Sequence, residues 1–235
     1  MRVIVIGGSD QGRQVIDAVD ARGDHTIVGV LDRALAGSVT ERRAGSVPER
    51  MAGASEVAGY PLLGRDDELR GCAERVEADG YVVAIGDNFA RAAVLDRADA
   101  SCPDLTLITV AHPTAVIARD AVIGAGSILL AGSIVSNGCI VGRGVLLGTR
   151  ASIDHDVHVD DYASVGPGAT TGGSVRLGRC TAISLGADII HGITIGADTV
   201  VGAGALVLTD LPAGVVAYGR PARVVRTRQP GDRYL

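Results

Sequence analysis

The segment "ASIDHDVHVDD", residues 151–161, places two histidines and four aspartates between long apolar stretches. Imidazole is the side chain whose unperturbed pKa lies nearest neutrality, so His155 can act as a general base toward an attacking amine or hydroxyl. Asp154 and Asp156 flank it, and either could accept a ring N–H and fix the imidazole tautomer. Charged residues on a repeat often serve solubility alone, so spacing leaves both interpretations open. His158 is interpreted as a structural or interface residue.

An aliphatic residue recurs every six residues through the second half of the chain, and Thr171 is the one interruption. A period of six fits neither a helix nor a long strand, so the chain must turn once in every hexad. Three hexads, or 18 residues, then close one triangular coil of a parallel β-helix with the aliphatic residues pointing inward. The sixteen positions are Ile117, Ile123, Leu129, Val135, Val141, Leu147, Ile153, Val159, Val165, Thr171, Leu177, Ile183, Ile189, Ile195, Val201 and Val207.

The 18-residue coil predicts which side chains stack in columns along the solenoid. His155 is expected to lie between Asn137 and Gly173, with His191 one coil beyond Gly173. These residues occupy the third position of their hexads, near a corner, where an ionisable group avoids the cost of burial in the core. Because Gly173 has no side chain, its N–H could approach a substrate oxyanion closely.

The first part of the chain alternates strands and helices. The strand "RVIVIG" leads through the glycine-rich turn "GGSDQG" to the helix "RQVIDAVDARG", and the strands "TIVGVLD" and "GYVVAIGDN" follow. This order predicts a small parallel sheet that binds ligands at the carboxyl ends of its strands. The turn is not a complete GxGxxG, so its glycines could serve only to turn the chain. Residues 33–58 are predicted to form a surface loop. The residues expected at the strand ends are Gly7, Gly8, Asp32, Gly86, Asp87 and Asn88.

Composition narrows the classes of function. The chain of 235 residues has a formal net charge of −5 and few aromatics, which argues against nucleic-acid binding. Its first apolar run is too short for a signal peptide or a membrane span, so we expect a soluble, cytoplasmic protein without a membrane partner. The four cysteines form no CxxC pair, which predicts reduced thiols and no zinc knuckle.

The whole chain resembles the bacterial NeuD/PglD family of sialic-acid O-acyltransferases and sugar-nucleotide N-acetyltransferases. The landmarks occur in order over more than 200 residues: "VIVIGGSDQGRQVID", "VGVLD", "GYPLLG", "VAIGDN", "AHPTAVIARDAVIG", "ASIDHD", "GPGATTGGSV", "VGAGALV" and "YGRPARVVR". The resemblance implies a Rossmann-like parallel-sheet α/β domain over residues 1–110, which binds a nucleotide sugar. It also implies a left-handed parallel β-helix acyltransferase domain over 111–208, and a tail over 209–235 that covers the coenzyme A groove.

The resemblance further implies a reaction and its residues. It implies acetyl transfer from acetyl-CoA, without a metal, to a nucleotide-linked amino sugar such as a 4-amino-4,6-dideoxyhexose, by a homotrimer in polysaccharide biosynthesis. Carried over by motif, the catalytic set is His155, Asp156 and Gly173. The coenzyme A set is Ser164, Gly173, Leu185 and Ala203. The substrate set is Gly8, Ser9, Gly12, Asp32, Gly86, Asp87 and Asn88.

The sequence departs from the family pattern at three places, and three other functions are also considered. Ser164 stands where relatives often have a second histidine, Gly148 where they often have asparagine, and "DQGR" where they commonly have "GHGK". The rivals are O-acetylation of sialic acid or another sugar hydroxyl, a γ-carbonic-anhydrase-like metal enzyme, and a non-catalytic nucleotide-sugar binder. For the metal enzyme, His155 and His191 lack a third histidine shortly after the second. The sequence names neither the nucleotide nor the sugar.

Overall fold

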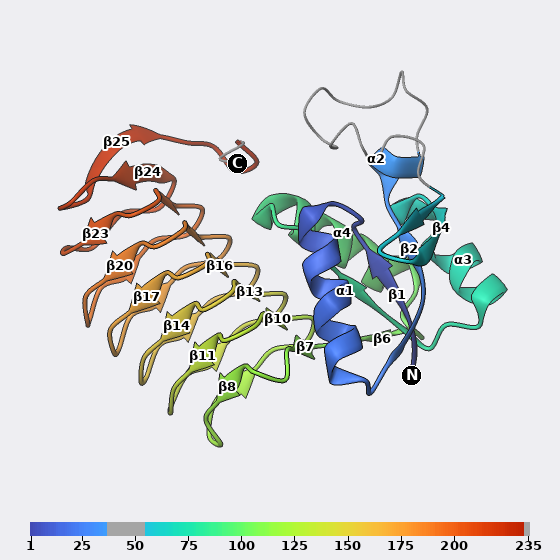
Figure 1. Ribbon diagram of the computed structural model, residues 1–235. Coiled ribbons are helices and arrows are strands. Elements are labelled where there is room, and N and C mark those ends of the chain that lie inside the picture. The colour runs from blue at the N-terminus through green and yellow to red at the C-terminus, as the bar shows by residue number, and fades with distance from the viewer. Residues whose placement is uncertain (37–54, 233–235) are drawn as a thin grey trace. The chain divides into compact units, whose positions relative to one another are not determined.

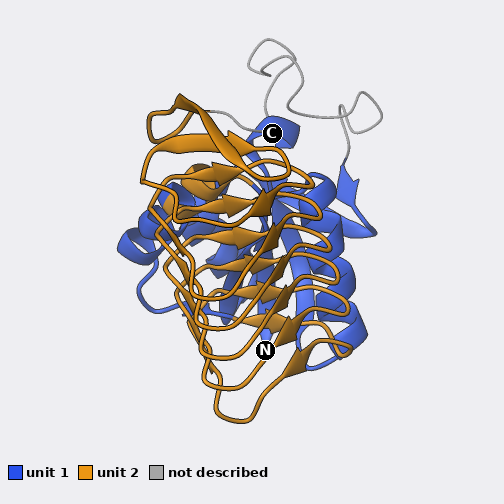
Figure 2. Ribbon diagram, turned by 90° about the vertical axis from the view of Figure 1, so that its left-hand side faces the viewer, with its two compact units in different colours: residues 1–86, 93–108 blue, residues 87–92, 109–235 orange. Residues whose placement is uncertain are grey.

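The computed structural model describes residues 1–36 and 55–232. The chain divides into two compact units, coloured separately in Figure 2. The first comprises Met1–Gly86 and Ala93–Ile108, and the second comprises Asp87–Ala92 and Thr109–Leu235. The division into functional domains at residues 110 and 208 stays a prediction.

The first unit is built on a mainly parallel sheet. Its strands are β1 (Arg2–Ile6), β2 (Thr26–Leu31), β3 (Glu56–Val57), β4 (Tyr60–Gly64), β5 (Gly80–Val83) and β6 (Thr106–Leu107), in the order β3-β4-β2-β1-β5-β6. Only β3 pairs antiparallel, with β4. The apolar run Val3, Ile4, Val5 and Ile6 is fully buried in β1, as expected for a central parallel strand.

Helices connect these strands. They are α1 (Asp10–Arg22), α2 (Arg33–Ala36), the short 3₁₀ helix η3 (Asp66–Glu68), α3 (Leu69–Val76) and α4 (Asn88–Ser101). Helix α1 ends as predicted, at Gly23, whose left-handed φ of 72° suits a C-cap glycine. It begins at Asp10, three residues before the predicted start, where the charge of Asp10 complements the helix dipole; Ser9 occupies the N-cap position without a side-chain capping hydrogen bond.

The predicted surface loop over residues 33–58 is wrong at both of its ends. Asp32 Oδ1 accepts hydrogen bonds from the N–H groups of Ala34 and Leu35, and so caps α2. The Leu35 side chain is buried, and Val57 of β3 is buried at the other end of the segment. Residues 37–54 lie outside the described part of the chain.

The second unit is a stack of parallel two-residue strands (Figure 1). Strands pair at a constant step of 18 residues, for example Ile134 with Ser152 and Ile153 with Thr171, so the predicted coil is confirmed. The strands fall into three sheets, with orders β7-β10-β13-β16-β19-β22, β8-β11-β14-β17-β20-β23 and β9-β12-β15-β18-β21. Their bounds are β7 (Val110–Ala111), β8 (Val116–Ile117), β9 (Val122–Ile123), β10 (Ile128–Leu129), β11 (Ile134–Val135), β12 (Ile140–Val141), β13 (Leu146–Leu147), β14 (Ser152–Ile153), β15 (His158–Val159), β16 (Ser164–Val165), β17 (Thr170–Thr171), β18 (Arg176–Leu177), β19 (Ala182–Ile183), β20 (Asp188–Ile189), β21 (Thr194–Ile195), β22 (Val200–Val201) and β23 (Leu206–Val207).

The inward columns form the core of the solenoid, and turns between the sheets form its edges. Val135, Ile153 and Val165 are fully buried in the core. We call the turn column that contains His155 and Gly173 the His155 edge, and the column that contains Leu185 and Ala203 the Leu185 edge. The His155 edge joins the β8 and β9 sheets, whereas the Leu185 edge joins the β7 and β8 sheets.

The second unit is completed by segments outside the repeat. Strand β24 (Val215–Tyr218) pairs parallel with β22, and β25 (Arg223–Thr227) returns antiparallel to β24. The buried Arg91 donates hydrogen bonds to the carbonyl oxygens of Gly144 and Tyr162, which fastens the segment 87–92 to the coils. Within residues 1–36 and 55–232, no helix combines the length and apolarity needed to cross a membrane.

Candidate active site

His155 projects from the His155 edge with half of its side chain exposed (52 %). Its Nδ1 lies 2.9 Å from Oδ2 of Asp156, and its backbone N–H donates to Oδ1 of Asp154 at 2.8 Å. With Nδ1–H donating to the Asp156 carboxylate, Nε2 carries the lone pair and is available to accept a proton. The side chains adjacent in sequence thus form a histidine–carboxylate pair at the surface of the coil.

Electrostatics makes this imidazole a stronger base. The hydrogen bond to Asp156 raises the pKa of His155 above its usual value, and the negative charge of Asp154 adds to the effect. Because the ring is exposed, desolvation opposes this only in part. The arrangement therefore favours proton uptake at the edge.

The backbone around Asp156 holds its carboxylate against the neighbouring coil. Asp156 adopts a left-handed φ of 58°, and its N–H donates to the carbonyl oxygen of Asn137 at 3.0 Å. A Cβ placed on Gly138 would lie 2.3 Å from Asp156 Oδ1. Gly138 therefore leaves the room that the carboxylate occupies.

Gly173 lies one coil further along the same edge, as predicted. The Ser174 N–H donates to the His155 carbonyl at 2.8 Å, and the Gly192 N–H donates to the Gly173 carbonyl at 2.9 Å, so the stacked column is confirmed. A Cβ on Gly173 would lie 2.4 Å from Cε1 and Nε2 of His155. No acceptor for the Gly173 N–H occurs among the described residues, so this amide remains able to bind an oxygen near the imidazole.

His191 lies in the same column but too far from His155 to share a metal with it. Two strand spacings separate the two residues, or about 10 Å, whereas zinc ligands must lie about 2 Å from the ion. Within the described part of the chain, no group of three or more His, Cys, Asp or Glu side chains could hold a metal ion. A zinc site formed by His155 and His191 of one chain is therefore disfavoured.

Of the predicted coenzyme A residues, Gly173 lies against His155, whereas Leu185 and Ala203 lie on a different edge of the same chain. Leu185 and Ala203 stack on the Leu185 edge, where the Gly204 N–H donates to the Leu185 carbonyl at 2.9 Å. The Leu185 side chain is 60 % exposed, so a ligand on this edge could contact it. Ser164 belongs to β16 in the β7 sheet and is buried.

Part of the predicted substrate set comes together at the carboxyl ends of β1 and β2 in the first unit. The Gly8 N–H donates to Asp32 Oδ2 at 2.7 Å, so the ends of β1 and β2 are joined by a hydrogen bond. Gly12 packs so closely under the preceding turn that a Cβ would lie 2.0 Å from the Gly7 carbonyl oxygen. Ser9 precedes α1 and is partly exposed. Gly12 therefore acts through packing, whereas Ser9 can contact a ligand directly.

Gly86 lies beside Gln11, since a Cβ on Gly86 would be 3.9 Å from the Gln11 side chain. Gln11 was not predicted as a site residue, yet its Nε2 is buried and has no hydrogen-bond partner among the described residues. Its place inside "GGSDQG" was the available signal. An amide donor without a partner beside two glycine turns suits an oxygen-rich ligand.

Asp87 and Asn88 have structural contacts within the second unit. Asp87 Oδ1 accepts the Ala90 N–H at 2.8 Å and caps the start of α4. Asn88 is buried, and its Nδ2 donates to the carbonyl oxygens of Cys180 and Thr181 at 3.2 and 2.9 Å. Because these bonds occupy the Asn88 amide donors, its assignment to the substrate stays a prediction.

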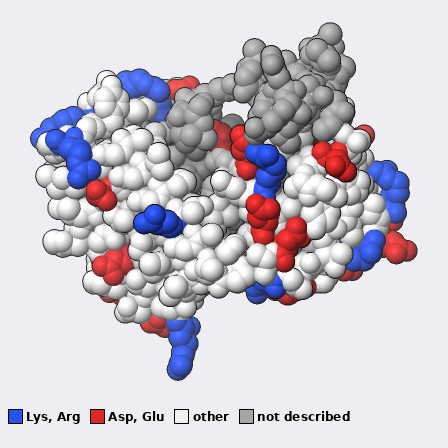
Figure 3. Space-filling view, viewed as in Figure 1, with Lys and Arg blue, Asp and Glu red and all other residues white. Residues whose placement is uncertain are grey.

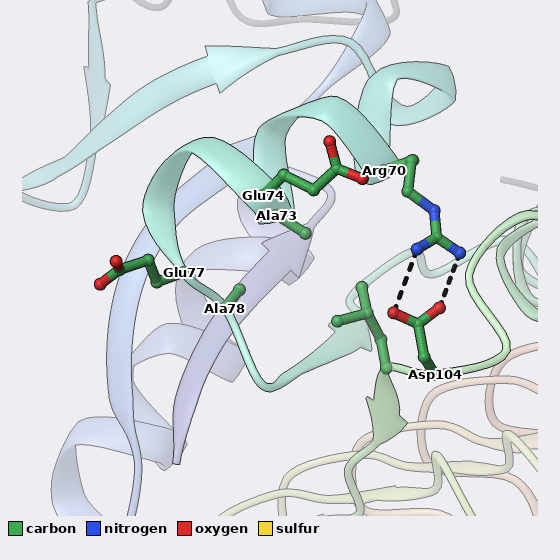
Figure 4. Close-up of a pocket in the computed structure, with 7 residues that line it drawn as sticks. Arg70, Ala73, Glu74, Glu77, Ala78 and Asp104 are labelled. Atoms are coloured by element: carbon green, nitrogen blue, oxygen red, sulfur yellow. Dashed lines mark hydrogen bonds and ion pairs between the residues drawn. The ribbon is translucent and has the colours of Figure 1, made fainter.

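A separate pocket of about 150 Å³ lies on α3 in the first unit. Figure 4 shows its ion pair, in which Arg70 Nη1 and Nη2 bind the Asp104 carboxylate at 3.0 and 2.6 Å. Glu74 and Glu77 also line it. The Arg70 side chain is thereby neutralised, and none of the predicted site residues lines this pocket.

Comparison with known proteins shows to which family the chain is related. Residues 2–98 match the family model of the PglD N-terminal domain. The structure of PerB from Caulobacter crescentus, in complex with CoA and GDP-perosamine, is similar at a TM-score of 0.84. It is 30 % identical in sequence, and the match covers 96 % of this chain and 98 % of that one. The chain belongs to the PglD family of hexapeptide-repeat sugar acyltransferases. The fold class is thereby confirmed: a parallel-sheet α/β domain is followed by a left-handed parallel β-helix.

Further relatives of the PglD-family chain agree. The acetyltransferase domain of PglB from Neisseria gonorrhoeae FA1090, in complex with acetyl coenzyme A, is 29 % identical at a TM-score of 0.80, over 95 % of this chain and 98 % of that one. Galactoside O-acetyltransferase from Escherichia coli K12 is 38 % identical over 65 residues, 28 % of this chain. The chain spans only 26 to 33 % of the length of this and two other curated relatives that it matches.

Proposed function

We propose that the protein transfers the acetyl group of acetyl-CoA to the amino group of a nucleotide-linked sugar, such as a 4-amino-4,6-dideoxyhexose. The observation that carries the proposal is the His155–Asp156 pair at the edge of the solenoid, with the backbone of Gly173 against the ring. Full-length similarity to PerB, which binds CoA and GDP-perosamine, supports this choice of substrates. The nucleotide and the configuration of the sugar remain to be measured.

The geometry supports a direct transfer. His155 Nε2 accepts a proton from the sugar amine as the amine nitrogen attacks the thioester carbonyl carbon. The oxyanion of the tetrahedral intermediate accepts a hydrogen bond from the Gly173 N–H. The C–S bond then breaks, and the imidazolium returns its proton to the thiolate of coenzyme A. Asp156 stabilises the imidazolium during these steps.

An acetyl-cysteine intermediate has no support in the described part of the chain. All four cysteines are buried. Burial raises the pKa of Cys139 and of Cys180, which disfavours their nucleophilic thiolates. Acetyl transfer therefore proceeds in a complex that holds both substrates together.

A homotrimer with sites between subunits accounts for the separation of the two edges. Coenzyme A on the Leu185 edge of one copy would meet His155 only if another copy supplied it. Exposed apolar side chains flank the His155 edge on its early coils: Val116, Val122, Ile134 and Ile140 are 59, 58, 39 and 45 % exposed. Figure 3 shows few charged side chains on the solenoid face turned to the viewer. Such a surface favours contact with another copy of the chain, and the tail 209–235 then covers the coenzyme A groove.

The nucleotide is assigned to the turns of the first unit. Gly8, Ser9 and Gly86 offer backbone close to the carboxyl ends of the strands, where ligands of parallel sheets bind. Asp32 fixes Gly8, and Gln11 supplies an amide donor without a partner among the described residues. We place the reaction in the cytoplasm, within polysaccharide biosynthesis.

The test is a thiol-release assay with acetyl-CoA and UDP-, GDP- and dTDP-linked 4-amino-4,6-dideoxyhexoses, with CMP-linked and free sialic acid as controls. We expect release with one amino sugar and a loss of about 100-fold or more in kcat for His155→Ala, with coenzyme A binding unchanged by calorimetry. His112→Ala, a histidine of an early coil, is the matched control. Release only with sialic acid would replace N-acetylation by O-acetylation. Wild-type kinetics in His155→Ala would contradict the mechanism.

A further inference from the structure

Between Ala118 and Ile190, the backbone ladder of the described solenoid is interrupted at one position, directly before His155. In the regular coils, the residue after each inward side chain donates its N–H to the carbonyl oxygen of the inward residue one coil on. Examples are Gly148 to Val165 and Asp160 to Leu177, both at 2.8 Å. From Ala118 to Ile190 only Asp154 lacks this bond among the described residues.

The Asp154 N–H is paired instead with a side chain. It donates to Oγ1 of Thr171 at 3.4 Å, a long hydrogen bond. Thr171 is the one polar residue among the sixteen positions of the aliphatic column, and its side chain is buried (6 % exposed). The one polar residue of the aliphatic column therefore pairs with the one N–H that lacks its ladder bond, and this N–H belongs to the residue before His155.

The carbonyl oxygen of Asp154, in the peptide that links Asp154 to His155, is held in a way that the repeat uses elsewhere. Cys139 Sγ–H donates to the Asp154 carbonyl oxygen at 2.9 Å. Ser127 and Thr181 donate in the same manner to carbonyl oxygens fifteen residues ahead. The Cys139 contact is thus a common feature of the repeat, whereas the Thr171 contact is specific to the coil of His155.

We propose that Thr171 is a positioning residue for His155, because its hydroxyl replaces the ladder carbonyl and fixes the backbone N–H of Asp154, the residue directly before His155. The inference rests on the proposed function for its consequence in catalysis. Asp154 links this contact to His155, because its Oδ1 accepts a hydrogen bond from the His155 N–H. The imidazole has little freedom beyond this, because it lies between the Asp156 carboxylate and Gly173.

Valine at position 171 removes the acceptor and leaves an aliphatic residue like those of the other coils. The Asp154 N–H must then pair with the carbonyl of residue 171, as in a regular coil, or lose its partner. Either outcome moves the His155 peptide relative to Asp156 and weakens the ring hydrogen bond. Serine at position 171 keeps the hydroxyl and should keep the position.

The experiment compares Thr171→Val, Thr171→Ser and the control Ser127→Ala, which removes another buried hydroxyl of the solenoid. For Thr171→Val we expect kcat to fall about 10-fold with a KM for acetyl-CoA within about twofold, as for loss of catalytic positioning. We also expect the pKa of His155, followed by NMR titration of its Cε1–H, to fall toward its usual value as the Asp156 bond weakens. Thr171→Ser and Ser127→Ala should match the wild type in both measurements.

Two results would overturn the inference: an unchanged kcat and His155 pKa in Thr171→Val, or an equal defect in Thr171→Ser. His155→Ala assigns the NMR signal. If the wild-type protein released no thiol with any acceptor, the proposed function would fail. The titration would still decide whether Thr171 sets the environment of His155, because it requires no turnover.

Discussion

The backbone of Gly173 lies directly against the imidazole of His155, one coil away along the same edge. A Cβ on Gly173 would come within 2.4 Å of both Cε1 and Nε2 of the ring. The column itself accepts side chains, since Asn137 and His191 occupy equivalent positions. The glycine is therefore required by the ring and not by the turn.

Gly173→Ala should displace the imidazole while leaving the fold intact. Gly173 does not have a left-handed φ, so alanine meets no backbone strain there, and the three atoms nearest its methyl group all belong to the ring. We expect kcat to fall about 100-fold, with a melting temperature close to that of the wild type. The double variant His155→Ala, Gly173→Ala should be no slower than His155→Ala alone. A further loss in the double variant would show that Gly173 acts independently of the ring.

Asp156→Asn should move the acid limb of the pH–rate profile to lower pH. His155 must be neutral to act as a base, so kcat/KM rises with pH through the His155 pKa. The Asp156 hydrogen bond is the first cause of the raised pKa, and its loss lowers that pKa toward the usual value. The plateau at high pH should also fall, by about 10-fold, because the imidazolium loses its partner.

The matched control for this profile is Asp160→Asn. Asp160 Oδ1 lies 3.5 Å from Nε2 of His158, so this variant alters a neighbouring histidine–carboxylate pair outside the proposed site. We expect its profile to overlay that of the wild type. A limb that stays in place in Asp156→Asn would assign the titration to another group.

Two glycine-to-alanine changes in helices of the first unit should have opposite effects on stability. At Gly12 a Cβ would lie 2.0 Å from the Gly7 carbonyl oxygen, so alanine forces β1 and α1 apart. We expect a loss of about 3 kcal/mol in the free energy of unfolding. Gly71 in α3 has no neighbour within 4 Å, and alanine there should add roughly 0.5–1 kcal/mol. Urea titrations of both variants measure the difference, and equal effects would contradict the packing argument.

Arg91→Met should destabilise the second unit. The buried guanidinium donates to the carbonyl oxygens of Gly144, Tyr162 and Ala163 and to the side chain of Asn88. Methionine fills similar space but removes four hydrogen bonds to buried acceptors, at a cost of about 3 kcal/mol in unfolding free energy. Arg91→Lys keeps the charge and should recover part of the loss in thermal denaturation. Wild-type stability in Arg91→Met would contradict this account.

The solenoid could be predicted closely because each of its contacts follows from one period. Each hexad contains one turn, and three hexads make one coil, so every strand pairs with the strand 18 residues further on. The stacking of His155 and Gly173 in one column therefore followed from counting residues. The break at Thr171 was also visible in the sequence. Its contact with Asp154 was not, because it depends on which of two acceptors, a carbonyl or a hydroxyl, the peptide meets.

The first unit was less predictable because its residues have tertiary partners that no local pattern indicates. Asp32 was recognised at the end of β2, but its hydrogen bonds to Gly8 and to the start of α2 depend on how the chain returns. Strand β4 and helix α3 were not anticipated. The same holds for Asn88 of the second unit, which was predicted to face a ligand, whereas its amide donates to carbonyl oxygens 92 and 93 residues away. Their assignments as ligand contacts stay predictions.

The unbroken 18-residue step also limits how the gene can change in length. One codon gained inside a hexad would turn the inward side chains of all later hexads toward solvent. The later corner residues, His155 among them if it followed the insertion, would leave their edge of the solenoid. A gain of six codons would restore the core but rotate all later residues to the next face, separating His155 from Gly173 if it fell between them. Only a block of eighteen codons inserted outside that coil preserves every column, so the solenoid can lengthen by whole coils alone.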